Sequence, residues 1–207
     1  MAIVAPLPTQ PDLFGDADPR PGPPPDGRGR LELAEGAWVD HHPDWLAGHD
    51  ALFAQLVPVL PWAQPEVTMY ERRLAQPRLS AHWRIAEPPV GVPVVVAEVA
   101  RVLGPAYGEE LATVGANLYR DGADSVAWHG DRIGRERTDA LVAIVSLGGR
   151  RPFCLRPRGG GRAVRFDLRG GDLLVMGGSC QRTWQHCVPK VARADARLSL
   201  SFRAVWG

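Results

Sequence analysis

The feature that most constrains the fold is a succession of short β-type segments that fills the second half of the chain. Glycine- or aspartate-containing turns separate them, as expected for strands rather than helices. The segments are VGANLY at 114–119, ALVAIVSL at 140–147, RPFCLRP at 151–157, AVRFDL at 163–168, DLLVMGG at 172–178, TWQHCV at 183–188 and RLSLSFRAVW at 197–206. This many short strands in succession favour a barrel of two packed sheets, of the jelly-roll kind.

Two apolar patterns with helical spacing precede the strands. The first runs from Trp45 to Leu56 and ends at Pro58. The second begins after Pro93 and stops at Gly104, one residue before another proline. The prediction is therefore an α+β chain, with a double-stranded β-helix (jelly-roll) core flanked by N-terminal helices.

We expect one domain behind a proline-rich segment in this chain of 207 residues. Residues 1–30 contain eight of the 20 prolines and have little to bury, which predicts a flexible or extended tail. The domain then covers residues 31–207, with helical support at 43–104 and the jelly-roll core at 111–207. Nothing in the sequence resembles a coiled coil, and we expect a monomer.

Composition argues against a membrane protein and against a disulfide scaffold. No apolar run is long enough to span a bilayer, and the first residues lack the basic stretch that opens a signal peptide. Three cysteines without a CxxC pair suit a reducing compartment, so we expect a cytoplasmic protein.

The net charge of +1 hides an asymmetry along the chain. Residues 1–131 contain 9 Lys and Arg against 18 Asp and Glu, whereas residues 132–207 contain 15 against 5. A basic C-terminal part suits a polyanion such as nucleic acid. The alternative explanation is codon bias in the gene, because nearly every basic residue is arginine and Lys190 is the only lysine.

The stretch SVAWHGD, residues 125–131, places two potential metal ligands after an apolar segment. His129 and Asp131 are separated by one glycine, and a polar turn at the end of a strand is the simpler explanation. A closed β framework brings distant strand ends together, however, and His186 lies on such a strand. Two histidines and one carboxylate on one face suit non-haem Fe(II), because they leave positions for a chelating cosubstrate and dioxygen.

A pair of arginines on the last predicted strand supports this interpretation. Arg197 and Arg203 are six residues apart in RLSLSFR, so the two-residue period turns both to the same side. Arginines inside a barrel need anionic partners, and a dicarboxylate supplies two. The alternative is that Arg203 pairs with a core aspartate or faces solvent. Together, these residues describe a site for iron and 2-oxoglutarate.

A fifteen-residue stretch carries a resemblance to a known family. NLYRDGADSVAWHGD (117–131) resembles the N-x-Y-x-D-G-x-D-x-x-x-x-H-x-D signature of AlkB-type Fe(II)/2-oxoglutarate dioxygenases, and RLSLSFR resembles that family's closing strand. The stretches at 141–161 and 171–190 are similar to the hairpin and the second-histidine strand of its DNA-repair branch, particularly its actinobacterial-type members. The resemblance runs from about residue 45 to 206.

The resemblance implies a role for each matching residue. The catalytic iron ligands are His129, Asp131 and His186. The residues that contact the 2-oxoglutarate cosubstrate are Asn117, Tyr119, Arg197, Ser201 and Arg203. The implied reaction is oxidative demethylation of 1-methyladenine and 3-methylcytosine in DNA. It consumes dioxygen and releases formaldehyde, succinate and carbon dioxide.

Five further residues are candidates to meet the substrate, since a base must leave the stack before an enzyme acts on it. Trp83 is a candidate wall for the flipped base, with core packing as the alternative. Met69 and Tyr70 match an apolar finger that wedges into the duplex in repair relatives. The alternative for them is a hairpin turn packed on the barrel. Arg78 is placed to meet phosphates, and Trp128 either contacts the substrate or packs around the site.

Other features leave the substrate open. Ile133 stands where many relatives carry an acidic residue that helps to read the damaged base, and Ser199 stands where the bacterial prototype has an asparagine. The basic loop at 156–162 is either a contact for the nucleic-acid backbone or a solvated hairpin tip. The alternatives to DNA demethylation are the same chemistry on RNA, tRNA or a protein side chain, and a non-catalytic nucleic-acid-binding barrel.

Overall fold

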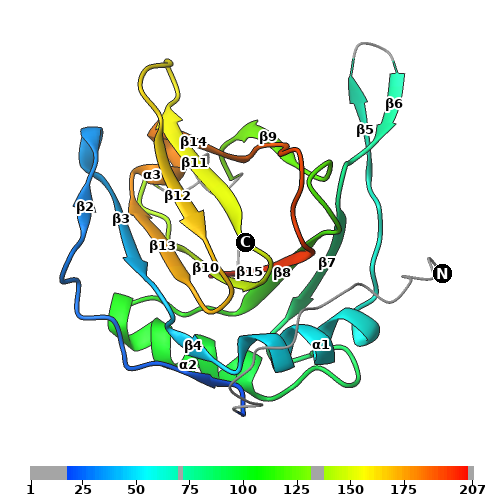
Figure 1. Ribbon diagram of the computed structural model, residues 1–207. Helices are drawn as coiled ribbons and strands as arrows, with labels where there is room; N and C mark the ends of the chain where they lie inside the picture. Colours follow the sequence, from blue (N-terminus) through cyan, green and yellow to red (C-terminus); the bar gives the residue numbers. More distant parts are fainter. Residues whose placement is uncertain (1–17, 70–71, 132–137, 205–207) are drawn as a thin grey trace.

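The computed structural model describes residues 18–69, 72–131 and 138–204, which form two facing antiparallel sheets (Figure 1). The larger sheet contains β2 (Leu31–Glu32), β3 (Ala37–His42), β7 (Leu79–Arg84), β8 (Thr113–Tyr119), β10 (Val142–Gly148), β13 (Leu173–Gly178) and β15 (Arg197–Arg203). The smaller sheet contains β9 (Val126–His129), β11 (Arg151–Pro157), β12 (Val164–Leu168) and β14 (Trp184–Val188). Their strand orders are β2–β3–β13–β10–β15–β8–β7 and β12–β11–β14–β9.

The chain passes back and forth between the two sheets. It runs from β8 to β9, returns with β10, crosses again for β11 and β12, and continues through β13, β14 and β15 in alternate sheets. This winding is a double-stranded β-helix, so the predicted jelly-roll core is confirmed. Each of the seven segments predicted from the sequence forms a strand.

Side-chain alternation along the larger sheet divides the core into two layers. Val142 and Ile144 of β10 pack between the sheets. Ala143 and Val145 of the same strand pack on the other face, against α1 (His49–Val59) and α2 (Val95–Tyr107). A strand that is buried on both faces reads as a continuous apolar run, which is why ALVAIVSL shows no alternation. Both helices therefore support the larger sheet from outside (Figure 1).

The first helix begins later than the sequence pattern suggests. Leu46 and Ala47 form the short strand β4 (Leu46–Ala47), which pairs with β1 (Arg20–Pro21). Gly48 then takes a φ of +63°, a left-handed conformation, and the helix starts at His49. The apolar side chains near Trp45 are buried by this strand pairing rather than by a helical face.

The second helix continues past the predicted stop at Gly104 to Tyr107. Its end is set by Gly108, which has a φ of +67°. The backbone N–H of Glu109 then donates to the carbonyl of Gly104 at 3.0 Å. A left-handed glycine that caps the last carbonyls is a common helix ending.

Part of the proline-rich segment packs against the domain instead of forming a flexible tail. Beyond the β1–β4 pairing, the indole N–H of Trp45 donates to the carbonyl of Pro23 at 2.8 Å. Arg30 donates to both carboxylate oxygens of the buried Asp40 at 2.9 Å. The flexible-tail prediction is therefore wrong for residues 20–30, and residues 1–17 lie outside the described part of the chain.

The segment between α1 and α2 forms three strands, whereas the sequence pattern predicted helical support for residues 43–104. β5 (Glu66–Met69) and β6 (Arg72–Ala75) pair as a hairpin that projects from the barrel (Figure 1). β7 then pairs with β8 and forms the edge of the larger sheet. The remaining short helices are η1 (Ala34–Gly36) and α3 (Cys180–Thr183). In the described ranges, no helix has the length and apolar character needed to cross a membrane.

Candidate metal and cosubstrate site

Strand pairing in the smaller sheet brings together two histidines that are distant in sequence. β9 runs antiparallel to β14, and His129 lies directly opposite His186. Their ring centroids are 4.3 Å apart. Asp131 follows β9 by two residues, and one potential ligand atom from each of these three side chains lies within 4.8 Å of the others. Two imidazoles and one carboxylate at this spacing suit one metal ion with open coordination positions.

A register shift in β9 turns its last residue toward the space between the sheets. Val126 pairs with Val188, and the next paired residue of β9 is His129. Because β14 has fewer residues between the same two pairs, β9 carries a bulge, and both Val126 and His129 line the cavity. The carbonyl of Ala127 lies 2.9 Å from Nδ1 of His129. When Nδ1 donates to this carbonyl, Nε2 is left with a lone pair for a metal.

Arg203, the last residue of β15, holds one oxygen of Asp131. Its Nε and Nη2 atoms both lie 2.7 Å from Oδ2. The other oxygen, Oδ1, lies 4.0 Å from Nε2 of His129 and 3.9 Å from Nε2 of His186. Burial acts to raise the pKa of Asp131, but the charge and hydrogen bonds of Arg203, together with the charges of His186 and His129, outweigh it and the pKa is lowered. Asp131 is therefore an ionised carboxylate with Oδ1 turned toward both histidines.

His186 is a buried imidazole held by an aromatic neighbour. The ring of Phe153 stacks on it, with centroids 5.4 Å apart and an interplanar angle of 20°. Burial, followed by the charge of His129, lowers the pKa of His186 to about 3. A neutral imidazole is the form that binds a metal, so burial prepares this side chain as a ligand.

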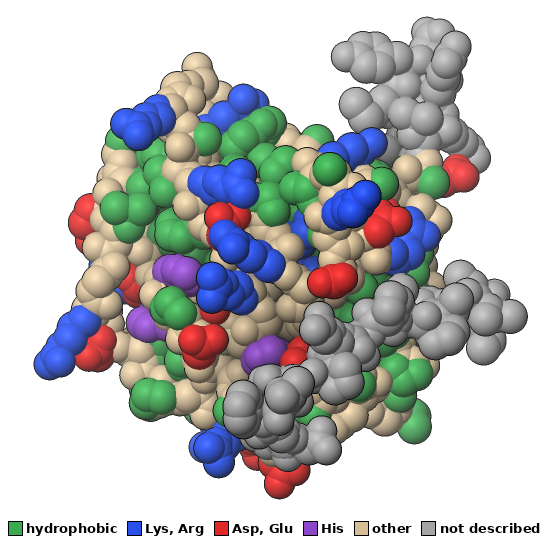
Figure 2. Space-filling model, viewed as in Figure 1, with side chains coloured by type: hydrophobic (Ala, Val, Ile, Leu, Met, Phe, Trp, Pro, Cys, Tyr) green, Lys and Arg blue, Asp and Glu red, His purple; other side chains and the backbone are tan. Residues whose placement is uncertain are grey.

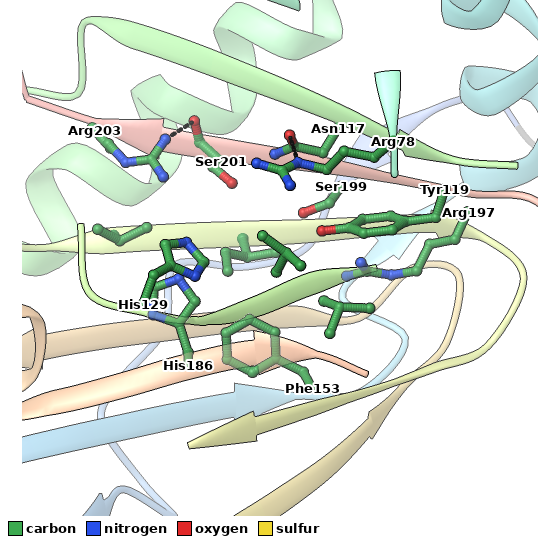
Figure 3. Close-up of a pocket in the computed structure, with 14 residues that line it drawn as sticks. Arg78, Asn117, Tyr119, His129, Phe153, His186, Arg197, Ser199, Ser201 and Arg203 are labelled. Carbon is green, nitrogen blue, oxygen red and sulfur yellow. Dashed lines mark hydrogen bonds between the residues drawn. The ribbon is translucent and has the colours of Figure 1, made fainter. Parts of the chain in front are cut away.

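The histidines lie at one end of a cavity between the sheets, and buried polar side chains lie at the other end (Figure 3). The cavity has about 420 Å³ of unfilled space, its open part included. Both arginines of RLSLSFR line it, so the predicted common side of Arg197 and Arg203 is confirmed. Ser199 and Ser201 lie between them on the same side.

Arg197 is a buried cation at the inner end of this cavity. Its side chain is 1% exposed, and its Nε donates to Oγ of Ser146 at 2.8 Å. Its Nη2 is buried and has no hydrogen-bond partner among the described residues. Burial lowers the pKa of Arg197 to about 10, which still leaves the guanidinium protonated at neutral pH. A buried guanidinium with an unused donor needs an anion, and a carboxylate matches its geometry.

Neighbouring strands add two further polar groups to the lining. Oδ1 of Asn117 accepts hydrogen bonds from Nε of Arg78 at 3.0 Å and from Oγ of Ser80 at 2.9 Å. Because the oxygen is occupied, the amide nitrogen is the atom of Asn117 that can donate to a ligand. The ring centroid of Tyr119 lies 5.6 Å from the guanidinium of Arg197. Burial raises the pKa of Tyr119, so its hydroxyl stays protonated and can donate.

The donor set and the unpaired guanidinium together define a class of enzyme. An oxygenase that uses Fe(II) and a 2-oxo dicarboxylate needs three protein ligands on one face of the metal and a buried cation for the remote carboxylate. The described residues provide both in one cavity.

Comparison with known proteins identifies the family. The family model of the 2OG-Fe(II) oxygenase superfamily matches residues 49–203. The alpha-ketoglutarate-dependent dioxygenase alkB homolog 3 of Bos taurus is 31% identical over 201 residues, which cover 88% of this chain and 68% of the relative. The DNA oxidative demethylase ALKBH2 of Arabidopsis thaliana is 27% identical over 190 residues, covering 70% and 59%. The chain belongs to the 2OG-Fe(II) oxygenase superfamily, in its AlkB-type branch, and is a dioxygenase that uses Fe(II), 2-oxoglutarate and O2.

A solved structure agrees on the fold. The structure of OsALKBH1 aligns with a TM-score of 0.57 and 17% sequence identity, covering 85% of this chain and 100% of that one. At this identity the likeness supports the double-stranded β-helix and carries no further argument.

The structure does not place Trp83 in the site. Leu79, Ala81 and Trp83 alternate along β7, and all three belong to the core that packs against the helices. Trp83 is 9% exposed within that core. Its prediction as a wall for a flipped base is therefore wrong, and the alternative of core packing is confirmed. The phase of β7 decides the point, because odd-numbered residues of this strand face the helices.

His82, on the opposite face of β7 from Trp83, is exposed and lies beside Arg203, a neighbour that the sequence reasoning missed. A β-carbon on Gly115 would lie 3.2 Å from Cδ2 of His82 and 3.2 Å from Nη1 of Arg203, so both side chains lie against this glycine. Loss of hydration, followed by the charges of Arg203 and Arg78, lowers the pKa of His82. It is a neutral imidazole between two cations. The register of β7 with β8 was the missing signal, since it puts His82 beside Gly115.

The other predicted substrate contacts are placed as follows. Trp128 points away from the cavity, and the guanidinium of Arg156 lies 4.2 Å above its ring. Arg78 lines the cavity beside Asn117 rather than an outer surface. Met69 ends β5 in the projecting hairpin, and Tyr70 and Ile133 lie outside the described residues.

Proposed function

We propose that this dioxygenase oxidatively demethylates alkylated bases of nucleic acid, with 1-methyladenine and 3-methylcytosine in DNA as its substrates. One observation carries the proposal: the two histidines of the His–Asp–His group and the buried guanidinium of Arg197 line opposite ends of one cavity. The relatives support the choice of substrate, because one of them is named a DNA oxidative demethylase. The basic C-terminal part of the chain agrees with a nucleic-acid partner.

The residues of the chain divide the work between holding the metal and holding the cosubstrate. His129, Asp131 and His186 hold Fe(II), and Arg203 keeps Asp131 ionised. Arg197 holds the remote carboxylate of 2-oxoglutarate through the donor that has no protein partner.

Bound together, Fe(II) and 2-oxoglutarate supply the oxidation of an N-methyl group by dioxygen. The buried walls around Phe153 and His186 exclude water from the inner part of the cavity. An alkylated base must reach the metal from the open side, because the inner end is occupied by the arginine and its carboxylate.

The test is release of formaldehyde and succinate from 15-nucleotide DNA strands that carry one 1-methyladenine or one 3-methylcytosine, with Fe(II) and 2-oxoglutarate. Matched RNA strands and duplex DNA form the other arms. We expect one formaldehyde and one repaired base per succinate with DNA. His129→Ala is the control, because it removes a proposed metal ligand and must abolish both products.

Other outcomes would assign a different function. Release from RNA strands alone would move the substrate from DNA to RNA. Succinate formation without repair of any strand would keep the dioxygenase and contradict a nucleobase substrate. Folded protein that converts no 2-oxoglutarate at all would favour a non-catalytic nucleic-acid-binding barrel.

A further inference from the structure

The two sheets differ in what lies on their outer faces. The larger sheet is covered by α1 and α2, whereas the smaller sheet has neither helix on its outer face (Figure 1). Arg156 of β11 pairs with Gln185 of β14, one register position from the pair Leu155–His186. Because His186 and Leu155 face inward, alternation turns Arg156 and Gln185 outward. The outer face of the smaller sheet is therefore polar at Arg156 and Gln185, whereas the outer face of the larger sheet is apolar.

A stacked arginine stands next to the metal ligands on this outer face. The guanidinium of Arg156 lies 4.2 Å from the ring centroid of Trp128, which is the residue before His129. Its Nε is buried without a hydrogen-bond partner in the described ranges. Its Nη2 has only a long contact, 3.4 Å, with the side chain of Gln185. The indole holds the guanidinium flat, but nothing described neutralises its charge.

Two more arginines extend the positive charge to the loop between the ligands. Nε of Arg158 donates to the backbone carbonyl of Arg182 at 2.9 Å, which ties the β11–β12 loop to α3. A β-carbon on Gly130, between His129 and Asp131, would lie 2.7 Å from Nη2 of Arg158. Both Arg158 and Arg182 are exposed.

The lack of acidic partners at this place contrasts with other arginines on the same sheet. Arg150 and Arg165 both pair with Asp167 at 2.8 Å. Among the described residues, no such carboxylate lies within ion-pair distance of Arg156, Arg158 or Arg182. Lys and Arg side chains gather over the part of the molecule that holds β11, β12 and β14 (Figure 2).

We propose that Trp128, Arg156, Arg158 and Arg182 form an arginine surface that binds the phosphates of the strand whose base enters the metal site. This proposal rests on the proposed function, because that function identifies the bound strand as nucleic acid with a methylated base. Guanidinium groups bind phosphate oxygens bidentately, and a stacked arginine is already oriented to do so. Phosphates flank a flipped base on both sides, so cations beside residues 128–130 are where such contacts are needed.

We expect the arginine surface to contribute to the affinity for nucleic acid, and not to the reaction at the metal or to the choice of base sequence. Each phosphate that an arginine neutralises on a single strand contributes about 0.7 to the slope of log affinity against log salt. Loss of two such arginines is therefore expected to reduce the slope by about 1.4. Chemistry at the metal is expected to be unchanged, because none of these side chains lines the cavity.

The experiment measures binding of a fluorescein-labelled, unmodified 15-nucleotide single strand by anisotropy between 50 and 200 mM salt. The variants are Arg158→Ala/Arg182→Ala and Arg156→Ala. The matched control is Arg20→Ala/Arg101→Ala, which removes two exposed arginines from β1 and α2. We expect a loss of about tenfold or more in affinity with a salt slope reduced by about 1.4 for Arg158→Ala/Arg182→Ala, a smaller loss with a slope reduced by about 0.7 for Arg156→Ala, and neither change for the control.

A second readout keeps this inference separate from the proposed function. Slow conversion of 2-oxoglutarate to succinate without any nucleic acid must stay at the wild-type rate in Arg158→Ala/Arg182→Ala. Equal affinity and slope in this variant and the control would overturn the arginine surface. Because the binding strand is unmodified, the surface can be confirmed even if no methylated base is ever repaired.

Discussion

At the scale of single residues, the buried Nη2 of Arg197 does most to distinguish a cosubstrate site from ordinary packing. Arg151, the other fully buried arginine among the described residues, donates to three backbone carbonyls through Nη1 and Nη2, and only its Nε lacks a partner. Arg197 has Ser146 as its only hydrogen-bond partner in the described part of the chain, and its side chain lines the cavity. A buried guanidinium with a single hydrogen-bond partner carries a free-energy cost that a bound anion in the cavity would offset.

Replacement of Arg197 by Met is expected to raise the KM for 2-oxoglutarate by roughly 10- to 150-fold. Hydrogen bonds to charged groups contribute about 1.5–3 kcal/mol, which corresponds to that range. The fold should persist, because apolar replacements of buried charges are often neutral or stabilising. Initial rates of succinate formation against 2-oxoglutarate concentration measure the effect.

The control for Arg197→Met is Arg193→Met, an exposed arginine between β14 and β15. Its KM should match the wild type. Fe(II) affinity should be unchanged in both variants, since neither side chain belongs to the metal-binding group. An unchanged KM in Arg197→Met would mean that another group holds the cosubstrate.

Residues of the metal site could be predicted from the sequence, whereas the substrate side could not. The sequence shows the spacing of His129 and Asp131 and the position of His186 on a distant strand. Few arrangements of a barrel bring all three side chains together. Trp83 and His82 are neighbours in β7, and only the strand's phase decides which packs in the core and which lies beside Arg203. That phase is set by pairing with β8, which a single sequence does not reveal.

At the scale of elements, Arg151 holds the turn that leads from β8 into β9. Its side chain is fully buried, and it donates to the carbonyls of Asp121, Asp124 and Pro189 at 2.7–2.9 Å. The first two carbonyls lie in the turn between β8 and β9, so one guanidinium on β11 positions the segment that leads to His129.

Arg151→Leu is expected to lower the free energy of unfolding by about 3 kcal/mol, because buried carbonyls left without donors cost about 1–3 kcal/mol each and water reaches some of them. Urea denaturation measures the loss. The adjacent Arg150→Leu is the matched control. Its ion pair with Asp167 is at the surface, where such pairs contribute about 0.2–1 kcal/mol. Equal losses in the two variants would contradict a special role for Arg151.

His42, at the end of β3, makes stability depend on pH. Its Nε2 is buried and lacks a hydrogen-bond partner within the described residues, and burial lowers its pKa. In the unfolded chain the imidazole takes up a proton below about pH 6.5. The unfolded state then binds more protons than the folded state, so stability falls as the pH drops below that value.

The expected result is a flatter pH dependence of the free energy of unfolding in His42→Gln between pH 7.5 and 5. His42→Phe, which keeps the ring volume and does not titrate, should show the same flattening. Urea denaturation at several pH values gives the difference between each variant and the wild type. A wild-type slope in both variants would show that the pKa of His42 is the same in the folded and the unfolded chain.

Strands were easier to predict than the boundaries of helices and of the N-terminal segment. Seven strands follow from local apolar runs and turns. The entry into α1 depends on pairing between β1 and β4, whose residues are more than twenty positions apart. The segment at 20–30 depends on Asp40 and Trp45 for its partners. Such long-range contacts override local composition, and no local pattern reveals them.

At the scale of the whole molecule, the metal group lies where β9 and β14 of the smaller sheet approach β15 of the larger sheet. His129 ends β9, His186 lies in β14, and Asp131 is bound by Arg203 of β15 in the larger sheet. β9 is the edge of the smaller sheet, with β14 as its only neighbour there among the described strands. A metal ion bound to both histidines and to Asp131 would therefore link the two sheets at their open end.

Metal and cosubstrate should stabilise the protein stepwise. A ligand at 100 times its Kd adds about 2.7 kcal/mol, and for a chain of this size each kcal/mol shifts Tm by roughly 2–4 °C. Mn(II), which does not turn over, is therefore expected to raise Tm by roughly 5–10 °C, and 2-oxoglutarate should add a further increase. EDTA should reverse both, as followed by differential scanning fluorimetry.

Two variants separate the steps of this stabilisation. His129→Ala should respond to neither ligand, because the metal group is incomplete. Arg197→Met should keep the Mn(II) shift and lose most of the increase from 2-oxoglutarate, because its defect lies at the inner end of the cavity. A full Mn(II) shift in His129→Ala would place the metal elsewhere. If both increases persist in Arg197→Met, the cosubstrate is held by the metal alone, and the buried guanidinium needs another explanation.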